Sequence, residues 1–256
     1  MSKVSPNLLD TSNKGHLFSH IQLEGAHQMA LDELLLRESF SQSSFAIAFR
    51  FYSWKGAWLS IGKNQQNIPT RWKNLVNQRK IKIVRRPSGG NAVLHSGGLT
   101  YSLIWKSPPT KKREAYFQAS QWLLKGFAEL GLPLNFGKEK ASLSSTNCFQ
   151  SSTQADLIDS NGSKRVGSAQ LWEKGHVLQH GEIVLNPPKE LWLDLFQEKP
   201  PKTFDTKLTS IQIEEVLKKH LFLCWPDLTW EERSISDKQL EEIKSTSKNY
   251  LLRSIS

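Results

Sequence analysis

The sequence predicts an α+β fold, with a mixed, largely antiparallel β-sheet core flanked by helices and a helical segment at its C-terminal end. Three observations lead to this prediction. An amphipathic helical pattern comes first, short apolar and aromatic runs with glycine turns fill the middle, and helical periodicity returns after residue 203. Nine tryptophans and twelve phenylalanines indicate a packed interior, because aromatic side chains bury large areas.

The first predicted element is a helix over residues 25–39. Ala30, Leu31 and Leu34 recur there at helical spacing and share one face of the helix, whereas Asp32 falls off that face. We therefore expect an amphipathic helix that packs its apolar side against the sheet.

The central part of the chain predicts five short strands. Residues 46–54 and 57–63 are apolar and aromatic, and a glycine turn separates them, which is typical of two paired strands. Residues 80–86 alternate isoleucine with lysine, and residues 91–95 and 99–105 again have strand composition. Because turn residues join these last three strands, we expect a β-meander.

The next part of the chain predicts a helix, a loop and a hairpin. Residues 112–131 carry aromatic and leucine side chains near helical spacing and end at a Gly-Leu-Pro stop. Residues 141–154 are rich in serine and threonine and have no period, which predicts a loop. Residues 164–172 and 176–185 flank a Glu-Lys-Gly turn and predict a β-hairpin.

The C-terminal part predicts two further helices, over residues 211–221 and 237–247. Ser210 and Ser236 stand at or near their N-caps, where a hydroxyl can accept a backbone N–H bond. We therefore divide the chain into three parts, which are a lead segment (1–24), a main catalytic domain (25–202) and an appended helical segment (203–256).

Composition limits the classes of function. Lysine and arginine exceed aspartate and glutamate by ten, which favours acidic partners, although a basic surface without a partner explains the charge equally well. Two cysteines are too few for a disulfide framework and are typical of a reducing cytosol. We expect a cytoplasmic protein without a secretory leader or membrane span, and no metal site, because paired zinc-ligand spacings are absent from the sequence.

Two blocks of sequence resemble a known family. Residues 85–95 read RRPSGGNAVLH and precede the LTYS of residues 99–102, while residues 164–170 read KRVGSAQ and precede the QHGE of residues 179–182. These blocks are similar to the signature of the biotin/lipoate protein ligase family, and most similar to its octanoyltransferases and to lipoate-protein ligase A. The resemblance implies that family's catalytic fold and the transfer of an octanoyl or lipoyl group to a protein lysine.

Further pieces of the chain narrow the resemblance. Residues 29–33 (MALDE) match another family segment in the expected order. Cys148 precedes Lys164 by sixteen residues, which is similar to the octanoyltransferases that use an enzyme-bound thioester. Many ligases of the family have His-Asp where this chain has His95-Ser96, and this departure weakens an assignment as a ligase.

Acyl transfer through a covalent intermediate needs a nucleophile and a group that lowers its pKa. Cys148 lies in a polar loop, and an ammonium from Lys164 nearby would favour the reactive thiolate. The alternative for Cys148 is a small buried side chain without reactivity, which its Ser, Thr, Asn and Gln neighbours disfavour. Cys224 follows leucine and phenylalanine and is interpreted as a core residue.

The resemblance also implies an acyl pocket between the glycine turn and the predicted hairpin. Gly89 and Gly90 allow backbone N–H groups to approach a carbonyl or phosphate, since no Cβ blocks them. Arg85 and Arg86 alternate across a strand, so only one of them can face the pocket, and we predict Arg85. The predicted substrate-binding residues are Arg85, Ser88, Gly89, Gly90, Ala92, His95, Gly167, Ser168, Ala169, His180 and Gly181; for the two histidines, a purely structural role is equally compatible with the sequence.

Three functions compete. The leading one is a transferase that requires no cofactor and moves octanoyl from acyl carrier protein, through Cys148, to lipoyl domains of 2-oxoacid dehydrogenases or to the glycine cleavage H protein. The second is a lipoate-protein ligase that uses ATP and Mg²⁺ and forms an acyl-adenylate held by Lys164. A nucleic-acid-binding module is disfavoured, because the segment before residue 25 leaves no room for a helix-turn-helix.

Overall fold

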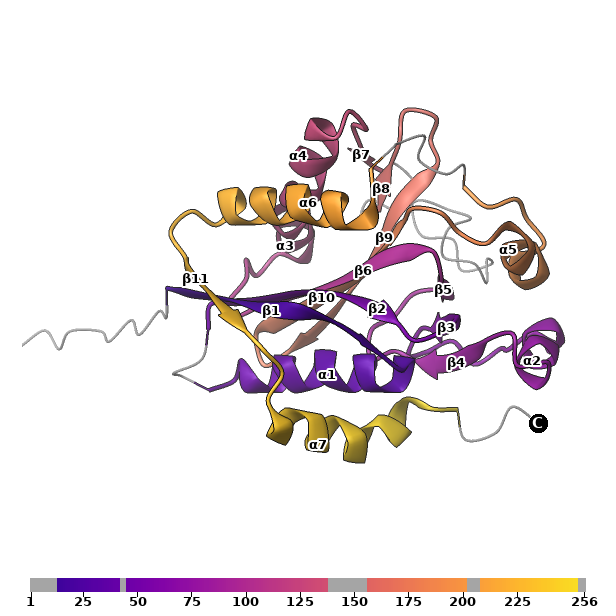
Figure 1. The fold of residues 1–256 in the computed structure, drawn as a ribbon. Coiled ribbons are helices and arrows are strands. Elements are labelled where there is room, and N and C mark those ends of the chain that lie inside the picture. Colours follow the sequence, from indigo (N-terminus) through magenta and orange to yellow (C-terminus); the bar gives the residue numbers. More distant parts are fainter. Residues whose placement is uncertain (1–12, 42–44, 138–155, 202–207, 253–256) are drawn as a thin grey trace, which may run out of the picture.

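The computed structural model describes residues 13–41, 45–137, 156–201 and 208–252. The predicted α+β class is confirmed: a large, mostly antiparallel sheet carries helices on both faces (Figure 1). Among the described residues, no helix is long and apolar enough to cross a lipid bilayer.

The main sheet has eight strands and mixes parallel with antiparallel pairing. Only the pairs that involve β1 are parallel, with β2 and with β11. In spatial order the strands are β11 (Thr229–Arg233), β1 (Lys14–Leu23), β2 (Ile47–Trp54), β6 (Gly98–Trp105), β10 (His176–Val184), β9 (Lys164–Glu173), β8 (Leu157–Ile158) and β7 (Asn135–Phe136). The predicted hairpin is confirmed as the pair β9 and β10.

A second, three-stranded sheet corrects two predicted pairings. It consists of β4 (Lys82–Arg85), β3 (Trp58–Ile61) and β5 (Val93–His95). The expected pairing of residues 46–54 with 57–63 is wrong, because β2 lies between β1 and β6 whereas β3 joins the small sheet. The expected meander is wrong for the same reason: β5 pairs with β3, and β6 pairs with β2 and β10.

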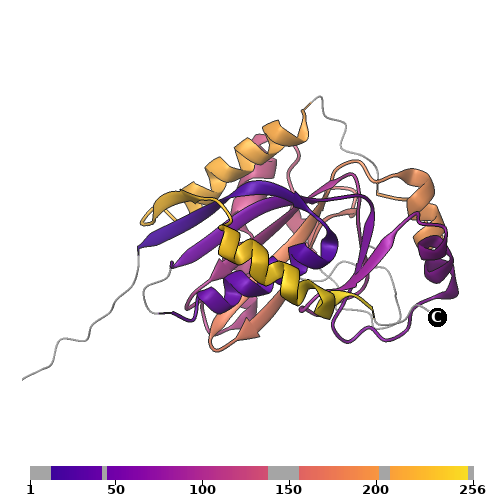
Figure 2. The same cartoon turned by 60° about the horizontal axis from the view of Figure 1, so that its bottom comes forward.

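Helices cover both faces of the main sheet. On one face lies α1 (Gly25–Glu38), and α7 (Asp237–Thr246) packs on its outer side, as Figures 1 and 2 show. The other face carries α3 (Lys112–Ala119), α4 (Gln121–Glu129) and α6 (Ser210–Cys224), so the single helix expected over residues 112–131 is divided at Ser120. The helices α2 (Thr70–Asn77) and α5 (Lys189–Phe196) pack beside the small sheet.

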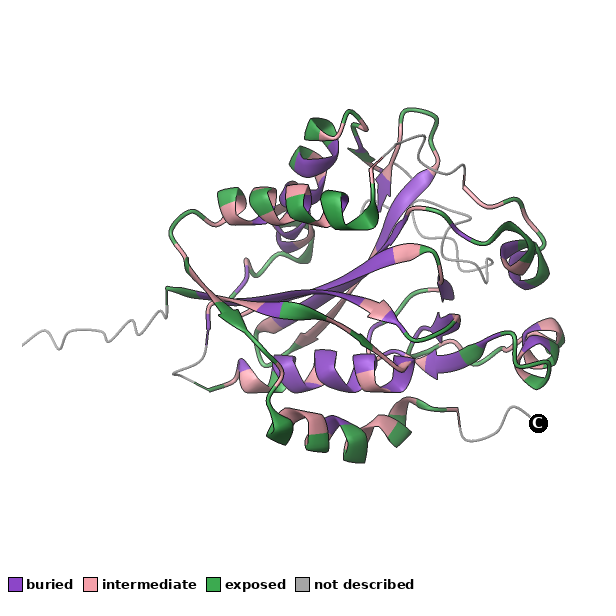
Figure 3. Cartoon of the chain, in the orientation of Figure 1, coloured by how far each residue is buried: buried purple, intermediate pink, exposed green. Residues whose placement is uncertain are grey.

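The helix α1 is more deeply buried than an amphipathic surface helix. Ala30, Leu31 and Ile243 belong to one apolar cluster, which joins α1 to α7. Asp32, which the periodicity places off the apolar face, is itself fully buried. Figure 3 shows this burial along α1, whereas α7 and α6 keep exposed outer faces. The expectation of a simple amphipathic α1 is therefore wrong for Asp32, since its carboxylate faces the sheet and bonds to side chains of β2 and β10.

The C-terminal segment contains more than the expected helices. Both helices are present, with Thr209 and Ser236 as their N-caps, each in a capping box with a glutamine three residues later. Between them β11 pairs with β1, a strand that the sequence left in the lead segment. The division of the chain at residues 24 and 202 stays a prediction.

Candidate active site

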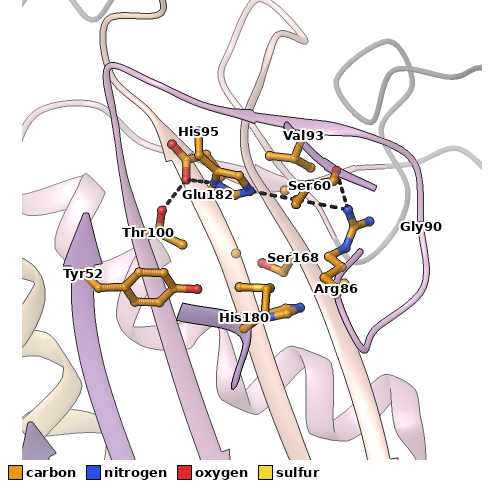
Figure 4. A pocket seen from close by; sticks show the side chains of 14 residues that line it. Tyr52, Ser60, Arg86, Gly90, Val93, His95, Thr100, Ser168, His180 and Glu182 are labelled. Carbon is orange, nitrogen blue, oxygen red and sulfur yellow. Dashed lines mark hydrogen bonds and ion pairs between the residues drawn. The ribbon is translucent and has the colours of Figure 1, made fainter. Parts of the chain in front are cut away.

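A pocket lies between the main sheet and the small sheet. Its wall combines glycines and small side chains of β9 and β10 with polar side chains from β2, β3, β5 and β6 (Figure 4). The lining residues are Met29, Tyr52, Ser60, Arg86, Gly90, Val93, His95, Thr100, Gly167, Ser168, Ala169, His180, Gly181 and Glu182.

One side of this pocket rests on a buried ion pair. The Asp32 carboxylate accepts hydrogen bonds from Arg50 Nη2 at 2.5 Å, from the Tyr52 hydroxyl at 3.1 Å and from His180 Nδ1 at 2.9 Å. Burial alone would raise the pKa of Asp32, but the Arg50 guanidinium and the His180 ring lower it to about 2. The carboxyl is therefore ionised at neutral pH. The other ring nitrogen of His180, Nε2, lies 2.5 Å from the Ser88 hydroxyl.

A second chain of hydrogen bonds crosses the pocket wall. Glu182 Oε2 lies 2.8 Å from His95 Nδ1 and accepts the Thr100 hydroxyl at 2.5 Å, while His95 Nε2 lies 2.8 Å from Ser60 Oγ. The Trp54 ring stacks on the His95 ring at 3.9 Å between centroids. Burial lowers the pKa of His95 and outweighs Glu182, which raises it. The imidazole is therefore neutral at pH 7.

The glycine turn is held by Arg86. Its guanidinium donates from Nη2 to the carbonyl oxygens of Gly89 at 2.7 Å and Asn91 at 2.8 Å, and from Nη1 to the Ser60 carbonyl at 3.0 Å. These bonds use three backbone acceptors at once, which suits the rigid donor fork of arginine. Arg86 thus ties the turn to the small sheet.

The prediction that Arg85 faces the pocket is wrong. Its Nη1 instead donates to the carbonyl oxygens of Gly62 at 2.9 Å and Gln65 at 2.7 Å, in the loop after β3. Alternation along the strand was the right principle, but Arg86 is the arginine on the pocket side. Both guanidiniums bind backbone carbonyls, and they stabilise different loops.

Close backbone contact also shapes the turn. A Cβ built on Gly62 would stand 1.9 Å from the Gly90 carbonyl oxygen, so only glycine fits there. Gly90 has a φ of +92°, a conformation that other residues rarely adopt. Gly89 is exposed and has nothing within 4 Å of its Cβ position. The turn therefore needs Gly62 and Gly90 for steric reasons, whereas Gly89 has space.

Seven of the predicted substrate-binding residues line the pocket together. They are Gly90, His95, Gly167, Ser168, Ala169, His180 and Gly181. Ser88 lies behind the wall and bonds to His180, Ala92 is packed in the apolar cluster of the small sheet, and Gly89 is on the exposed side of the turn. The binding roles of the whole set stay predictions.

Lys164 begins β9 and is buried. Its ammonium lies 2.9 Å from Asp156 Oδ1, and both side chains are at most 4% exposed. Cys148 lies outside the described residues, so its predicted approach to Lys164 stays a prediction. Cys224, in α6, is half-buried, and burial raises the pKa of its thiol.

Sequence reasoning missed several polar residues of the site. Asp32, Glu182, Tyr52 and Ser60 belong to the two hydrogen-bonded chains but were not selected. Asp32 and Glu182 both stood inside the quoted family blocks, MALDE and QHGE, so the signal was present. In the parts of the chain that the structure describes, no group of three His, Cys, Asp or Glu residues could hold a metal ion.

Comparison with known proteins identifies the family. A family model described as the lipoyl protein ligase A/B catalytic domain matches residues 24–221. The chain belongs to that family. Two relatives named octanoyltransferase LipM are each 34% identical: the protein of Halalkalibacterium halodurans, with 87% of this chain and 91% of the relative covered, and that of Bacillus subtilis, with 86% and 82% covered.

Solved structures of the lipoyl protein ligase A/B fold agree with this arrangement. A lipoate-protein ligase A bound with ATP superposes with a TM-score of 0.76 over 92% of this chain and 94% of its own, at 18% identity. A bipartite lipoate protein ligase from Thermoplasma acidophilum, described with its E2 lipoyl domain, gives 0.73 over 93% and 92%, at 16% identity. These structures show the same fold, while the family model and the relatives named octanoyltransferase indicate an enzyme of the octanoyltransferase and lipoate ligase family.

Proposed function

We propose that this enzyme transfers an octanoyl group from acyl carrier protein to the lysine of a lipoyl domain, or of the glycine cleavage H protein, through a thioester on Cys148. The observation that carries the proposal is the similarity to relatives named octanoyltransferase over most of both chains. The reaction exchanges one thioester for another and then for an amide, so it requires no cofactor and no ATP. We place it in the cytoplasm.

The geometry supports an acyl substrate. The pocket has small residues on one wall and neutral or paired polar groups on the other, which suits an apolar chain with one carbonyl. The cavity measures about 50 Å³, room for a few water molecules. We therefore expect Met29, an adaptable side chain on its lining, to move when the acyl chain enters.

Lys164 provides the second element of the mechanism. It sits three residues before Gly167 on β9, the strand that forms the small-residue wall. A buried ammonium beside the Cys148 sulfur would stabilise the thiolate that attacks the donor thioester. The thiol of the carrier then leaves, and the lysine amine of the acceptor attacks the Cys148 thioester and releases the cysteine.

The test uses the two cysteines as a matched pair. Purified protein is incubated with octanoyl-acyl carrier protein, and the acyl adduct is located by mass spectrometry of the intact protein and its peptides. We expect the adduct at Cys148, its loss with Cys148→Ala, and its retention with Cys224→Ala. Full transfer by Cys148→Ala without any adduct would refute the covalent route.

The ATP-dependent ligase gives a different signature in the same preparation. That reaction releases pyrophosphate when free lipoate or octanoate and ATP are supplied. We expect no such release above the rate of a Lys164→Met variant. Rapid, lipoate-dependent pyrophosphate release would instead assign a ligase.

A further inference from the structure

Three side chains that are distant in sequence form a continuous chain beside the pocket. Asp32 comes from α1, His180 from β10 and Ser88 from the turn that precedes the two glycines. The carboxylate Oδ2 lies 2.9 Å from His180 Nδ1, and His180 Nε2 lies 2.5 Å from Ser88 Oγ. All three residues are at most 5% exposed.

The partners of Asp32 determine the direction of these hydrogen bonds. An ionised carboxylate only accepts, and its other contacts here, to Arg50 and to the Tyr52 hydroxyl, are donors. His180 Nδ1 must therefore carry a proton toward Asp32. If Nε2 is the unprotonated nitrogen, it accepts the hydroxyl proton of Ser88, and the oxygen of Ser88 is fixed in place.

The order of groups is that of a serine nucleophile, its base and an orienting carboxylate. Ser88 nevertheless does not line the pocket, and its side chain is 1% exposed. An acyl carbonyl in the pocket would meet the His180 ring and Gly90 before it met the Ser88 oxygen. Because Ser88 is buried behind the wall, we assign the hydrogen-bonded series Asp32–His180–Ser88 to orienting the pocket wall and the turn.

The turn is also attached to the loop after β3 through its backbone. The backbone carbonyl of Ser88 accepts the Lys63 N–H at 2.8 Å, and Gly62 is in close contact with the carbonyl of Gly90. The 88–90 turn is therefore held by backbone contacts to the loop after β3 and by one side-chain bond, from Ser88 to His180.

We propose that Asp32 is a positioning residue: it fixes the tautomer of His180, which through Ser88 holds the 88–90 turn against the acyl pocket. The effect of this positioning on catalysis rests on the acyl transfer proposed above. The tautomer itself is a property of the protein without substrate, so it is measurable whichever transfer mechanism operates.

The first test is nitrogen NMR of the histidine rings in the full-length protein. We expect His180 with a protonated Nδ1 and an unprotonated Nε2 in the wild type. In Asp32→Asn, the amide oxygen faces Arg50 and its NH₂ faces His180, so the proton should move to Nε2. His95, which has its own carboxylate in Glu182, is the internal reference and should keep its signals.

The second test is a double-mutant cycle on transfer kinetics. Asp32→Asn and Ser88→Ala should each lower kcat/KM by about 10-fold or more, and the double variant should lose no more than the worse single variant. Gln28→Leu is the matched control: Gln28 accepts from Arg50 Nη1 at 2.6 Å, on the same ion pair but outside the pocket lining. We expect it to lower thermal stability and to keep the His180 tautomer and kcat/KM within about two-fold.

Three outcomes would overturn the proposal. They are a wild-type His180 with its proton on Nε2 alone, additive losses in the cycle, and an acyl ester on Ser88, which would make that serine a nucleophile. If Asp32→Asn does not fold, the His180 tautomer in the wild type and in the Ser88→Ala variant still tests the proposal. Transfer by the wild-type enzyme without any acyl adduct on Cys148, together with the expected His180 tautomer, would refute the covalent route and leave this inference intact.

Discussion

At the residue scale, buried titratable groups next to the pocket link stability to pH. His95 is buried, and its pKa lies below the ordinary 6.5. The unfolded chain therefore binds a proton to this ring before the folded protein does, and the stability due to the neutral ring is lost as pH falls below about 6.5.

The variant His95→Gln tests this link between stability and pH, because glutamine keeps a hydrogen-bonding side chain but cannot titrate. The free energy of unfolding should fall less steeply between about pH 7 and pH 5 in the variant than in the wild type. Urea unfolding at several pH values measures this slope. Equal slopes for the two proteins would show that His95 is not buried in its neutral form.

Two glycines of the loops around the pocket give a contrasting pair. Gly62→Ala places a methyl group 1.9 Å from the Gly90 carbonyl, so we expect a loss of roughly 1–3 kcal/mol in unfolding free energy and weaker binding of an octanoyl substrate. Gly89→Ala meets nothing within 4 Å and should leave stability unchanged or slightly higher. Thermal unfolding of both variants checks this, and an equal loss in both would contradict the steric argument.

Individual residues also mark where sequence reasoning stops. Periodicity separates Arg85 from Arg86 onto opposite faces, but it does not say which face meets the pocket, because that depends on where the small sheet packs. For Asp32, the helical pattern indicated an off-face position, and only its partners on the sheet, Arg50 and Tyr52 of β2 and His180 of β10, explain its burial. The glycine turn and the Gly-Ser-Ala stretch of β9 were found from the local sequence, because small residues there indicate positions where another group approaches the backbone closely.

At the element scale, strand composition predicted most of the strands but not their partners. β2 and β3 follow each other across a short turn, which favours a hairpin, yet each pairs with strands that are remote in the sequence. The hairpin of β9 and β10 was predictable because its partners are also neighbours in the chain. β7 and β8 were missed because each is two residues long, and β1 and β11 because neither shows a clear alternating pattern.

The packing of α7 on α1 gives an element-scale prediction. Ile243 of α7 is 1% exposed and lies in the cluster that includes Leu31, whereas Ile211 of α6 is 68% exposed. Ile243→Ala should lower the unfolding free energy by about 2–5 kcal/mol, and Ile211→Ala by well under about 1 kcal/mol. Denaturant unfolding of the two matched variants measures both. Similar small losses would mean that α7 contributes little to the fold.

At the scale of the whole molecule, the pocket depends on segments from most of the described chain. Its wall uses α1, β2, β3, β5, β6, β9 and β10, and Asp32 connects to His180 across 148 residues. Such a site emerges only when both sheets are assembled. The sequence could therefore predict its two main blocks, and both carboxylates stand in the quoted family segments, but their pairing with His180 and His95 follows only from the assembled sheets.

The same interdependence applies to the C-terminal segment, where β11 pairs along β1 and α6 buries Ile213, Leu217 and Leu221 in the main core. A chain that ends at residue 202 would expose the edge of β1 and this apolar face to water, which favours association between molecules. We expect the truncated protein to aggregate or to lose its cooperative thermal transition, as measured by size-exclusion chromatography and circular dichroism. If it stays monomeric and melts at the temperature of the full chain, the segment is a dispensable appendage, as the division at residue 202 supposes. A failure to fold would instead place residues 208–252 within the catalytic domain itself.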